Sequence, residues 1–277
     1  MTQNSVYIVC LRSNSDLAAE IPVKEILEIG DNQIIVDRFG TGPAVVVLHG
    51  EPGPRSCAKF VEILAQSHEV HVPYIVGWHG TRRGQHIHEV RDVALVSQTY
   101  VERLERPVSV VGLSFGGWIG IEMAINSPEL IGKLVLCSPI GLKVGGREDR
   151  DFEDLYLLDA QSREALYHAP GRTASFHSLI HEDDAFLEKA VADEAVARYC
   201  WCPYMHDPRL AGKLGRISAK TLILAGNDNR FILNSNYYCH YSSLIRGSEL
   251  KILDGLGHRL EEEEPHALAN HVKEFLC

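Results

Sequence analysis

The sequence has no run of apolar residues long enough to cross a membrane and no cluster of basic residues. A membrane-spanning helix needs about 20 consecutive apolar residues, and the apolar run at 6–11 is too short for the core of a signal peptide. Lys and Arg number 27 against 37 Asp and Glu, so the formal net charge is −10. Because nucleic acids and anionic membranes are bound through basic surfaces, we expect neither as a partner. We expect a cytoplasmic protein, and the sequence leaves open whether it forms a homodimer.

Paired cysteines and metal-ligand spacings are also lacking. The seven cysteines are scattered and odd in number, which favours reduced thiols over a disulfide framework. Cys200-Trp201-Cys202 lacks the two-residue spacing of zinc and redox pairs, and His86-Ile87-His88 has no Cys or carboxylate at ligand spacing. The sequence therefore predicts no metal site and no cofactor.

What the sequence does contain is an alternation of strand and helix patterns along 277 residues. The unbroken apolar run at 44–48, for example, is typical of a strand buried on both faces. Strands joined to helices by short connections predict an α/β protein with a mostly parallel sheet and helices on both faces. Strands are predicted at 21–29, 33–38, 44–48, 69–75, 107–111, 133–137, 221–225 and 249–253, and helices at 59–66, 90–104, 118–125 and 265–276.

One stretch, residues 141–216, interrupts this alternation with polar, aromatic and helical patterns. A single helical insertion in such a sheet protein fits a cap over the carboxyl ends of the strands, where open α/β sheets bind ligands. The predicted organisation is an irregular arm or added edge strand at 1–20, an α/β core at 21–140 and 217–277, and a helical cap at 141–216.

The most informative motif is Gly112-Leu113-Ser114-Phe115-Gly116. It follows a strand pattern and precedes a helix that is apolar almost all round, which is the context of a nucleophile elbow. The turn would expose Ser114 at its tip, and the start of the helix would direct free backbone N–H groups at any charge that develops there.

A base and an acid follow the elbow in the order Ser, Asp, His. His258 comes after the last predicted strand, and Asp228 comes after the strand before it. Serine is too weakly acidic to attack alone, so His258 would take its proton and later return it to the leaving group. The acid would hold the imidazole in the right tautomer and stabilise its charge.

The loop after the first buried strand, His49-Gly50-Glu51-Pro52-Gly53, supplies a candidate oxyanion hole. The N–H groups of Glu51 and Phe115 would bind the oxyanion together. The role of the Glu51 carboxylate is left open: it would repel an anionic substrate, bind a polar one or point to solvent. We expect His49, Gly50, Trp201 and Phe231 to contact the substrate.

These motifs together resemble the α/β-hydrolase fold family over residues 21–277. The resemblance rests on His49-Gly50, on Gly112 to Gly117, on the Asp-bearing turn after Leu224 and on Gly257-His258. The segment Asp207-Pro208-Arg209-Leu210 is similar to the cap of esterase-like and carbon–carbon-bond hydrolases of this fold. The His-Gly-Glu-Pro loop resembles that of haloalkane dehalogenases, but those use an Asp nucleophile where this chain has Ser114, which disfavours dehalogenation.

The chain departs from the family at the acid. The resemblance implies a carboxylate three residues after the strand-ending glycine, and that position is Asn229, followed by Arg230. The carboxylate lies one residue earlier, so Asp228 is the expected acid if the turn is rearranged. A neutral orienter at Asn229 is the alternative, since Asn can hold a His tautomer but cannot offset an imidazolium charge.

The sequence thus predicts a cofactor-independent serine hydrolase with a Ser114-His258-Asp228 triad. Its small-molecule substrate would be a small to medium, largely apolar ester, thioester, lactone or C–C bond next to a carbonyl. Two alternatives stay open, because fold does not fix chemistry. One is a lyase or cofactor-free oxygenase that uses His258 as its base, and the other is a receptor-like ligand-binding protein.

Overall fold

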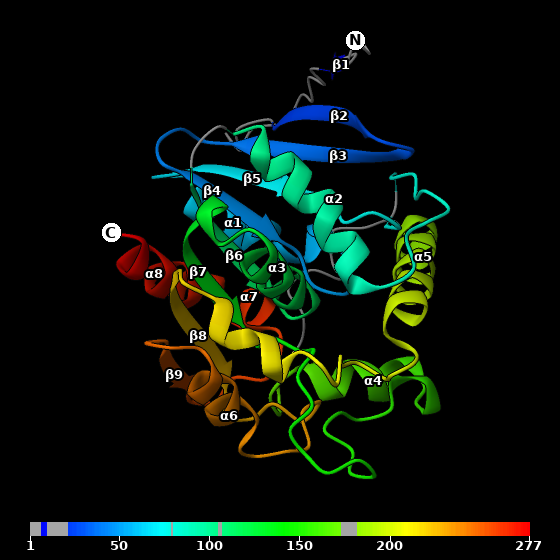
Figure 1. Cartoon of the computed structure of the whole chain (residues 1–277). Helices are drawn as coiled ribbons and strands as arrows, with labels where there is room; N and C mark the ends of the chain where they lie inside the picture. Colours follow the sequence, from blue (N-terminus) through cyan, green and yellow to red (C-terminus); the bar gives the residue numbers. More distant parts are fainter. Residues whose placement is uncertain (1–6, 10–21, 79, 105–106, 173–181) are drawn as a thin grey trace.

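The computed structural model of the chain describes residues 7–9, 22–78, 80–104, 107–172 and 182–277 (Figure 1). Its centre is a nine-stranded sheet with the order β1-β2-β3-β5-β4-β6-β7-β8-β9. Neighbouring strands run parallel from β5 through β9, whereas β1, β2 and β3 are antiparallel additions at one edge. The strands are β1 (Tyr7–Val9), β2 (Val23–Ile29), β3 (Asn32–Phe39), β4 (Ala44–Leu48), β5 (Glu69–Pro73), β6 (Val108–Leu113), β7 (Ile131–Cys137), β8 (Lys220–Gly226) and β9 (Glu249–Leu253).

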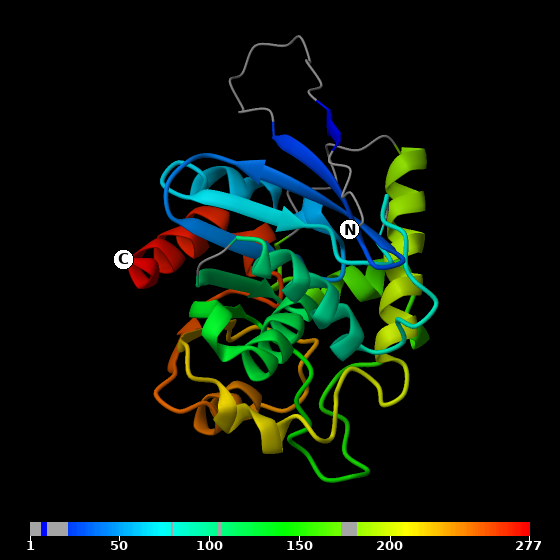
Figure 2. The ribbon, with the colours of Figure 1, turned by 45° about the horizontal axis from the view of Figure 1, so that its top comes forward.

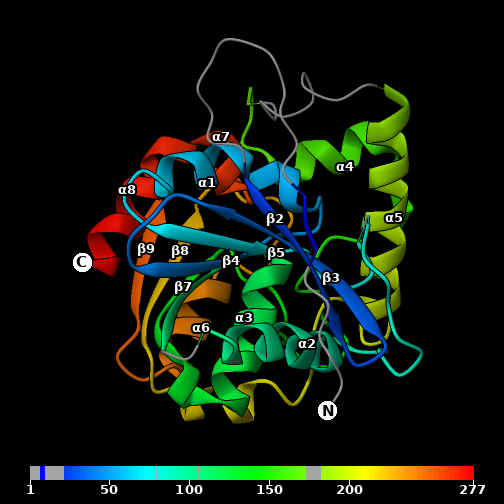
Figure 3. The same cartoon turned by 90° about the horizontal axis from the view of Figure 1, so that it is seen from above.

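Helices cover both faces of the sheet, which confirms the predicted α/β architecture. They are α1 (Ala58–Leu64), α2 (Val90–Glu102), α3 (Phe115–Asn126), α4 (Ala160–Tyr167), α5 (Glu182–Cys200), α6 (Tyr237–Leu244), α7 (Leu260–Glu263) and α8 (Pro265–Leu276). Short 3₁₀ helices occur at Pro54–Cys57, Pro128–Leu130, Leu155–Leu157 and Ala211–Arg216. Seen from above, α1, α7 and α8 lie on one face of the sheet, and α2, α3 and α6 lie on the other (Figure 3).

The central strands are apolar on both faces because two separate cores cover them. In β4, Val46 and Leu48 join the cluster under α2, α3 and α6, whereas Val45 and Val47 join the cluster under α1, α7 and α8. All four side chains are almost completely buried. Burial of a Val or Leu side chain stabilises a fold by roughly 1.5–3 kcal/mol, so this strand fixes the position of the loop that follows it.

The segment between β7 and β8 contains α4 and α5. Helix α5 stands at one end of the molecule, outside the two helical layers that cover the sheet (Figure 2). Residues 173–181 of the predicted cap lie outside the described residues, and the division into arm, core and cap stays a prediction. Of the predicted arm, β1 pairs antiparallel with β2 as an added edge strand.

Two helices near the site were not expected from the sequence. Helix α6 buries Tyr237, Tyr238 and Tyr241, but Ser, Cys and His between these aromatic residues hide the helical pattern. Helix α7 is a single turn that begins right after Arg259. In the sequence, its glutamates were interpreted as residues preceding α8. None of the described helices is long and apolar enough to cross a membrane.

Candidate active site

Ser114 sits in a sharp turn between β6 and α3. Its backbone has φ 47°, a left-handed conformation that costs a non-glycine residue on the order of 1–3 kcal/mol. The turn is possible because Gly112 and Gly116 have no side chain. A Cβ at Gly116 would lie 2.1 Å from the carbonyl oxygen of Leu48, and one at Gly112 would lie 2.5 Å from the Cα of Gly117. The two glycines therefore let the elbow approach β4 and its own helix.

The Ser114 hydroxyl lies between two side chains that come from distant parts of the chain. Its Oγ is 2.6 Å from Oε1 of Glu51 and 2.6 Å from Nε2 of His258. All three residues are buried, with exposed fractions of 4% for Ser114, 6% for Glu51 and 1% for His258. The structure thus brings Ser114 and His258 together, and it adds a carboxylate at the same oxygen.

His258 is held in the loop between β9 and α7. Its backbone N–H donates to the carbonyl oxygen of Tyr167 at 2.7 Å, and its ring packs edge-on against Phe231 with a centroid distance of 5.0 Å. Burial, together with the nearby charges of Arg259 and His168, lowers the pKa of His258 to about 3. The imidazole is therefore neutral at neutral pH.

The other ring nitrogen of His258 contacts an amide. Nδ2 of Asn229 lies 2.9 Å from Nδ1 of His258 and 3.0 Å from the hydroxyl oxygen of Tyr238. The orientation of this amide is fixed, because its Oδ1 accepts the backbone N–H groups of Phe231 and Ile232. An amide nitrogen can only donate, so Nδ1 of His258 accepts and the proton of a neutral imidazole resides on Nε2.

Asp228 does not contact His258, so the prediction that it is the orienting acid is corrected here. Its backbone N–H donates to the carbonyl oxygen of Leu256 at 2.9 Å, and its side chain is exposed. The turn after β8 therefore keeps its ordinary register and directs position 229 at the imidazole. The alternative of a neutral orienter at Asn229 is the arrangement that the structure has.

The loop after β4 presents Glu51 to the serine. His49 stabilises this loop, because its Nε2 accepts the N–H of Ile75 at 3.0 Å and its Nδ1 lies 2.8 Å from the carbonyl oxygen of Gly50. The indole N–H of Trp78 donates to the carbonyl oxygen of Glu51 at 3.0 Å. These bonds anchor the backbone on both sides of Glu51 and leave its side chain directed at Ser114.

The Glu51 carboxyl has an unusual electrostatic environment. Burial raises its pKa, whereas hydrogen bonds from Ser114 and from its own backbone N–H lower it, as does the charge of Arg259. Glu51 forms no ion pair with any residue that the structure describes. Its side chain thus lies beside its own N–H, one of the two predicted oxyanion donors.

The second predicted oxyanion donor is the N–H of Phe115, the first residue of α3. Residues of a first helical turn have no carbonyl four residues earlier within the helix to bind. The use of the Phe115 and Glu51 N–H groups as an oxyanion hole stays a prediction.

A cavity of about 200 Å³ opens beside Glu51, between α4, α5 and the loop that carries Arg259. Leu155, Tyr156, Tyr167 and Val196 give it apolar walls. Most charged side chains at its edge are paired with each other, such as Arg163 with Asp193 at 2.9 Å. The cavity is therefore a largely apolar space with a charged edge, and Glu51 in its wall is the residue that contacts Ser114.

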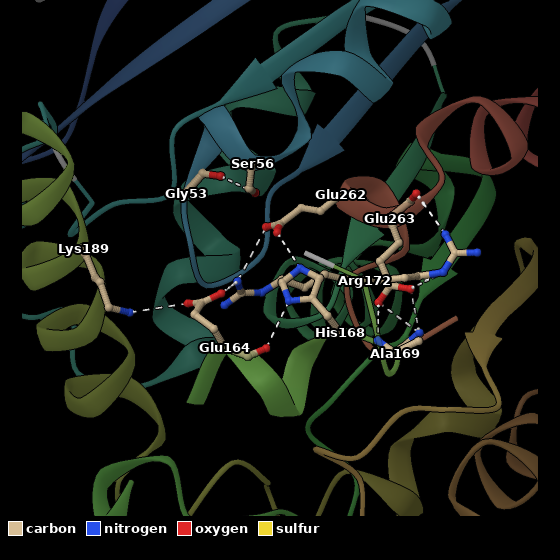
Figure 4. Close-up of polar contacts among 11 residues, drawn as sticks. Gly53, Ser56, Glu164, His168, Ala169, Arg172, Lys189, Glu262 and Glu263 are labelled. Carbon is tan, nitrogen blue, oxygen red and sulfur yellow. Dashed lines mark hydrogen bonds and ion pairs between the residues drawn. The ribbon is translucent and has the colours of Figure 1, made fainter. Parts of the chain in front are cut away.

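A polar network joins α4 and the segment after it to α7 (Figure 4). Nε2 of His168 lies 3.0 Å from Oε2 of Glu262, and its Nδ1 lies 3.0 Å from the carbonyl oxygen of Glu164. Glu263 accepts the N–H groups of Gly257 and Ala169. These bonds fix the two segments whose junction holds His258.

The four predicted substrate-contacting residues have different surroundings. Gly50 lies against Ser114, since a Cβ there would be 3.7 Å from that of the serine, and His49 is buried behind it. Phe231 is buried against the His258 ring. Trp201 is 59% exposed and packs on Tyr156. Their contact with a substrate stays a prediction.

Sequence reasoning preferred Asp228 and kept Asn229 as the alternative, because the family resemblance places the acid at position 229. It missed one feature of the site, the contact of the Glu51 carboxylate with Ser114. No sequence signal placed the Glu51 side chain. Across the residues that the structure describes, no group of three or more His, Cys, Asp or Glu is arranged to hold a metal ion.

Comparison with known proteins agrees with this geometry. The sequence model of the alpha/beta hydrolase family matches residues 45–271. A 2-hydroxy-6-oxo-2,4-heptadienoate hydrolase of Pseudomonas putida is 26% identical over 256 residues, which cover 86% of this chain and 90% of that protein. A 2-hydroxy-6-oxo-6-phenylhexa-2,4-dienoate hydrolase of Comamonas testosteroni is 26% identical over 251 residues, which cover 79% of this chain and 82% of that protein.

Solved structures show the same fold. A carboxylesterase from Bacillus subtilis superposes with a TM-score of 0.74 at 16% identity and covers 92% of each chain. A 2-hydroxy-6-oxo-6-phenylhexa-2,4-dienoate hydrolase from Rhodococcus has a TM-score of 0.69 at 18% identity, covering 92% of this chain and 98% of that one. The chain belongs to the alpha/beta hydrolase family and is a hydrolase.

Proposed function

We propose that this hydrolase is a cofactor-independent serine hydrolase that forms an acyl-enzyme on Ser114. The observation that carries the proposal is the Ser114 hydroxyl, strained in an elbow at the start of α3 and 2.6 Å from Nε2 of His258. A hydroxyl in this position attacks a carbonyl carbon, and N–H groups at the helix start stabilise the oxyanion. Water then releases the acyl group.

The proposed substrate is a small to medium, largely apolar molecule with an ester, thioester, lactone or C–C bond next to a carbonyl. The apolar walls of the cavity beside Glu51 support this class. So do the names of relatives, which include dienoate hydrolases and a methyl ester esterase of Nitrosospira multiformis that is 30% identical over 117 residues. Asn229 takes the place of the acid in the proposed site, and the proposed enzyme is a cytoplasmic one.

Labelling with a fluorophosphonate tests this proposal. We expect folded protein to be modified covalently at Ser114, because the reagent reacts with activated serines and leaves ordinary ones alone. Mass spectrometry of the digested protein locates the label. A panel of nitrophenyl esters of graded chain length then measures the size of the acyl site. Folded protein that neither takes the label nor turns over any ester would refute the proposal.

A further inference from the structure

The positions of the protons on Asn229 and His258 leave Glu51 as the acceptor for the Ser114 hydroxyl proton. Asn229 donates to Nδ1 of His258, so Nε2 carries the proton of the neutral imidazole and points it at Oγ of Ser114. The serine hydroxyl then donates to Oε1 of Glu51, 2.6 Å away. The opposite assignment would place a protonated Nδ1 against an amide N–H, with two donors facing each other.

We propose that Glu51 is the general base of this enzyme and takes the Ser114 proton directly, while His258 acts as a hydrogen-bond donor to the serine oxygen. The inference rests on the proposed function, in which Ser114 is the nucleophile. It assigns to the Glu51 side chain a catalytic role that is separate from that of its backbone N–H.

The charge balance of the site favours this route. An imidazolium at His258 would have the amide of Asn229 at Nδ1 in place of a carboxylate, and Arg259 follows it directly in the chain. A carboxylate at Glu51 would repel an oxyanion forming next to its N–H. Transfer of the serine proton to Glu51 removes that charge as the oxyanion appears, so the net charge of the site stays constant.

The groups that face Glu51 allow it to accept a proton. The positive charge of Arg259 lowers the pKa of Glu51, and the negative charge of Glu262 raises it. The charge of Glu51 in turn raises the pKa of three nearby groups, Tyr167, Tyr238 and Cys200. Arg259 is itself 3.0 Å from Glu164, so it is shared with another carboxylate. Burial raises the pKa of Glu51 and makes it a stronger base than an exposed glutamate.

The proton and electron pairs balance through one turnover. As Oγ of Ser114 bonds to the carbonyl carbon, its proton moves to Oε1 of Glu51 and the carbonyl π pair becomes the oxyanion. Collapse breaks the bond to the leaving group, which takes the proton from Glu51. In deacylation a water oxygen attacks the acyl carbon and gives a proton to Glu51, which returns it to Oγ as the serine leaves.

Two substitutions in combination test the inference. Glu51→Gln keeps the shape of the side chain and removes the base. Asn229→Asp places a carboxylate against Nδ1, which moves the proton to Nδ1 and turns Nε2 into an acceptor. The readout is the second-order rate of fluorophosphonate labelling for wild type, both single variants and the double variant, with thermal unfolding as a check that each is folded.

We expect Glu51→Gln to slow labelling by about 100-fold or more in the wild-type background, the usual contribution of a general base. In the Asn229→Asp background, where His258 can act as base, the same change is expected to alter the rate by less than about threefold. Glu62→Gln, which removes an exposed carboxylate paired with Lys59 on α1, is the matched control and leaves the rate unchanged.

Other outcomes overturn the inference. Full labelling of Glu51→Gln would show that the carboxylate is not the base, and an equal loss in both backgrounds would show that it acts only through the shape of the site. Wild-type protein that is not labelled at all would overturn the proposed function and this inference with it.

A second variant decides the matter if Asn229→Asp does not fold. Glu51→Ala opens space at the wall of the cavity, and formate can replace the missing carboxylate there. Formate is expected to raise the labelling rate of Glu51→Ala at least about tenfold, which is part of the contribution of a general base, and to leave Ser114→Ala unlabelled. Labelling of Glu51→Ala that stays slow at every formate concentration contradicts the inference.

Discussion

Ser114→Ala is expected to lower kcat for a nitrophenyl ester by about 10⁵-fold or more, with KM within about threefold of wild type. The change removes Oγ, the atom that lies between Glu51 and His258 and that forms the acyl bond. Because a methyl group fits where the hydroxyl was, the cavity beside Glu51 keeps its shape and still binds the ester. Steady-state kinetics with a chromogenic ester measures both constants.

The matched control for this variant is Ser243→Ala. The Ser243 hydroxyl is on the exposed side of α6 and donates to the carbonyl oxygen of His240, so its loss leaves turnover at the wild-type level. If Ser114→Ala kept more than a tenth of the activity while His258→Ala lost it, the chemistry would belong to His258 and the enzyme would not work through an acyl-serine.

Gly116→Ala is expected to destabilise the protein by about 3 kcal/mol or more, at the upper end of overpacking costs, and to abolish ester turnover. A Cβ at this position would lie 2.1 Å from the carbonyl oxygen of Leu48 and 2.5 Å from that of His49. Both obstacles are backbone atoms, so the start of α3 must move away from β4. Ser114 then moves away from Glu51. Denaturant unfolding measures the loss.

Gly212→Ala is the comparison for this substitution. Nothing lies within 4 Å of a Cβ built at Gly212, so the same change there alters the free energy of unfolding by less than about 1 kcal/mol. A Gly116→Ala protein as stable and active as wild type would mean that the elbow does not depend on its close approach to β4.

The sheet and the elbow could be predicted because local patterns specify them. The unbroken apolar run of β4 required burial on both faces, and α8 had Pro265 at its first turn and a periodic apolar face, so both were predicted with the bounds that the structure has. The elbow needed only a strand, two glycines and an apolar helix in sequence. Such features depend on neighbouring residues.

The contacts that set the chemistry depend on distant residues instead. The Glu51 side chain meets Ser114 across 63 positions of sequence, and its direction follows from bonds that His49 and Trp78 make to the surrounding backbone. The turn at 228 and 229 was ambiguous because two short polar residues stand side by side. Backbone N–H groups of Phe231 and Ile232 resolve it by binding the Asn229 oxygen.

The protonation of His258 is the most direct measure of how Ser114 is activated. Two-bond ¹⁵N–¹H correlation spectra of histidine-labelled protein distinguish the two neutral tautomers, and comparison with His258→Gln assigns the signal. We expect the wild-type ring to be neutral with its proton on Nε2, and the proton to move to Nδ1 in Asn229→Asp. A wild-type ring protonated at Nδ1 would contradict the assignment of Glu51 as the base.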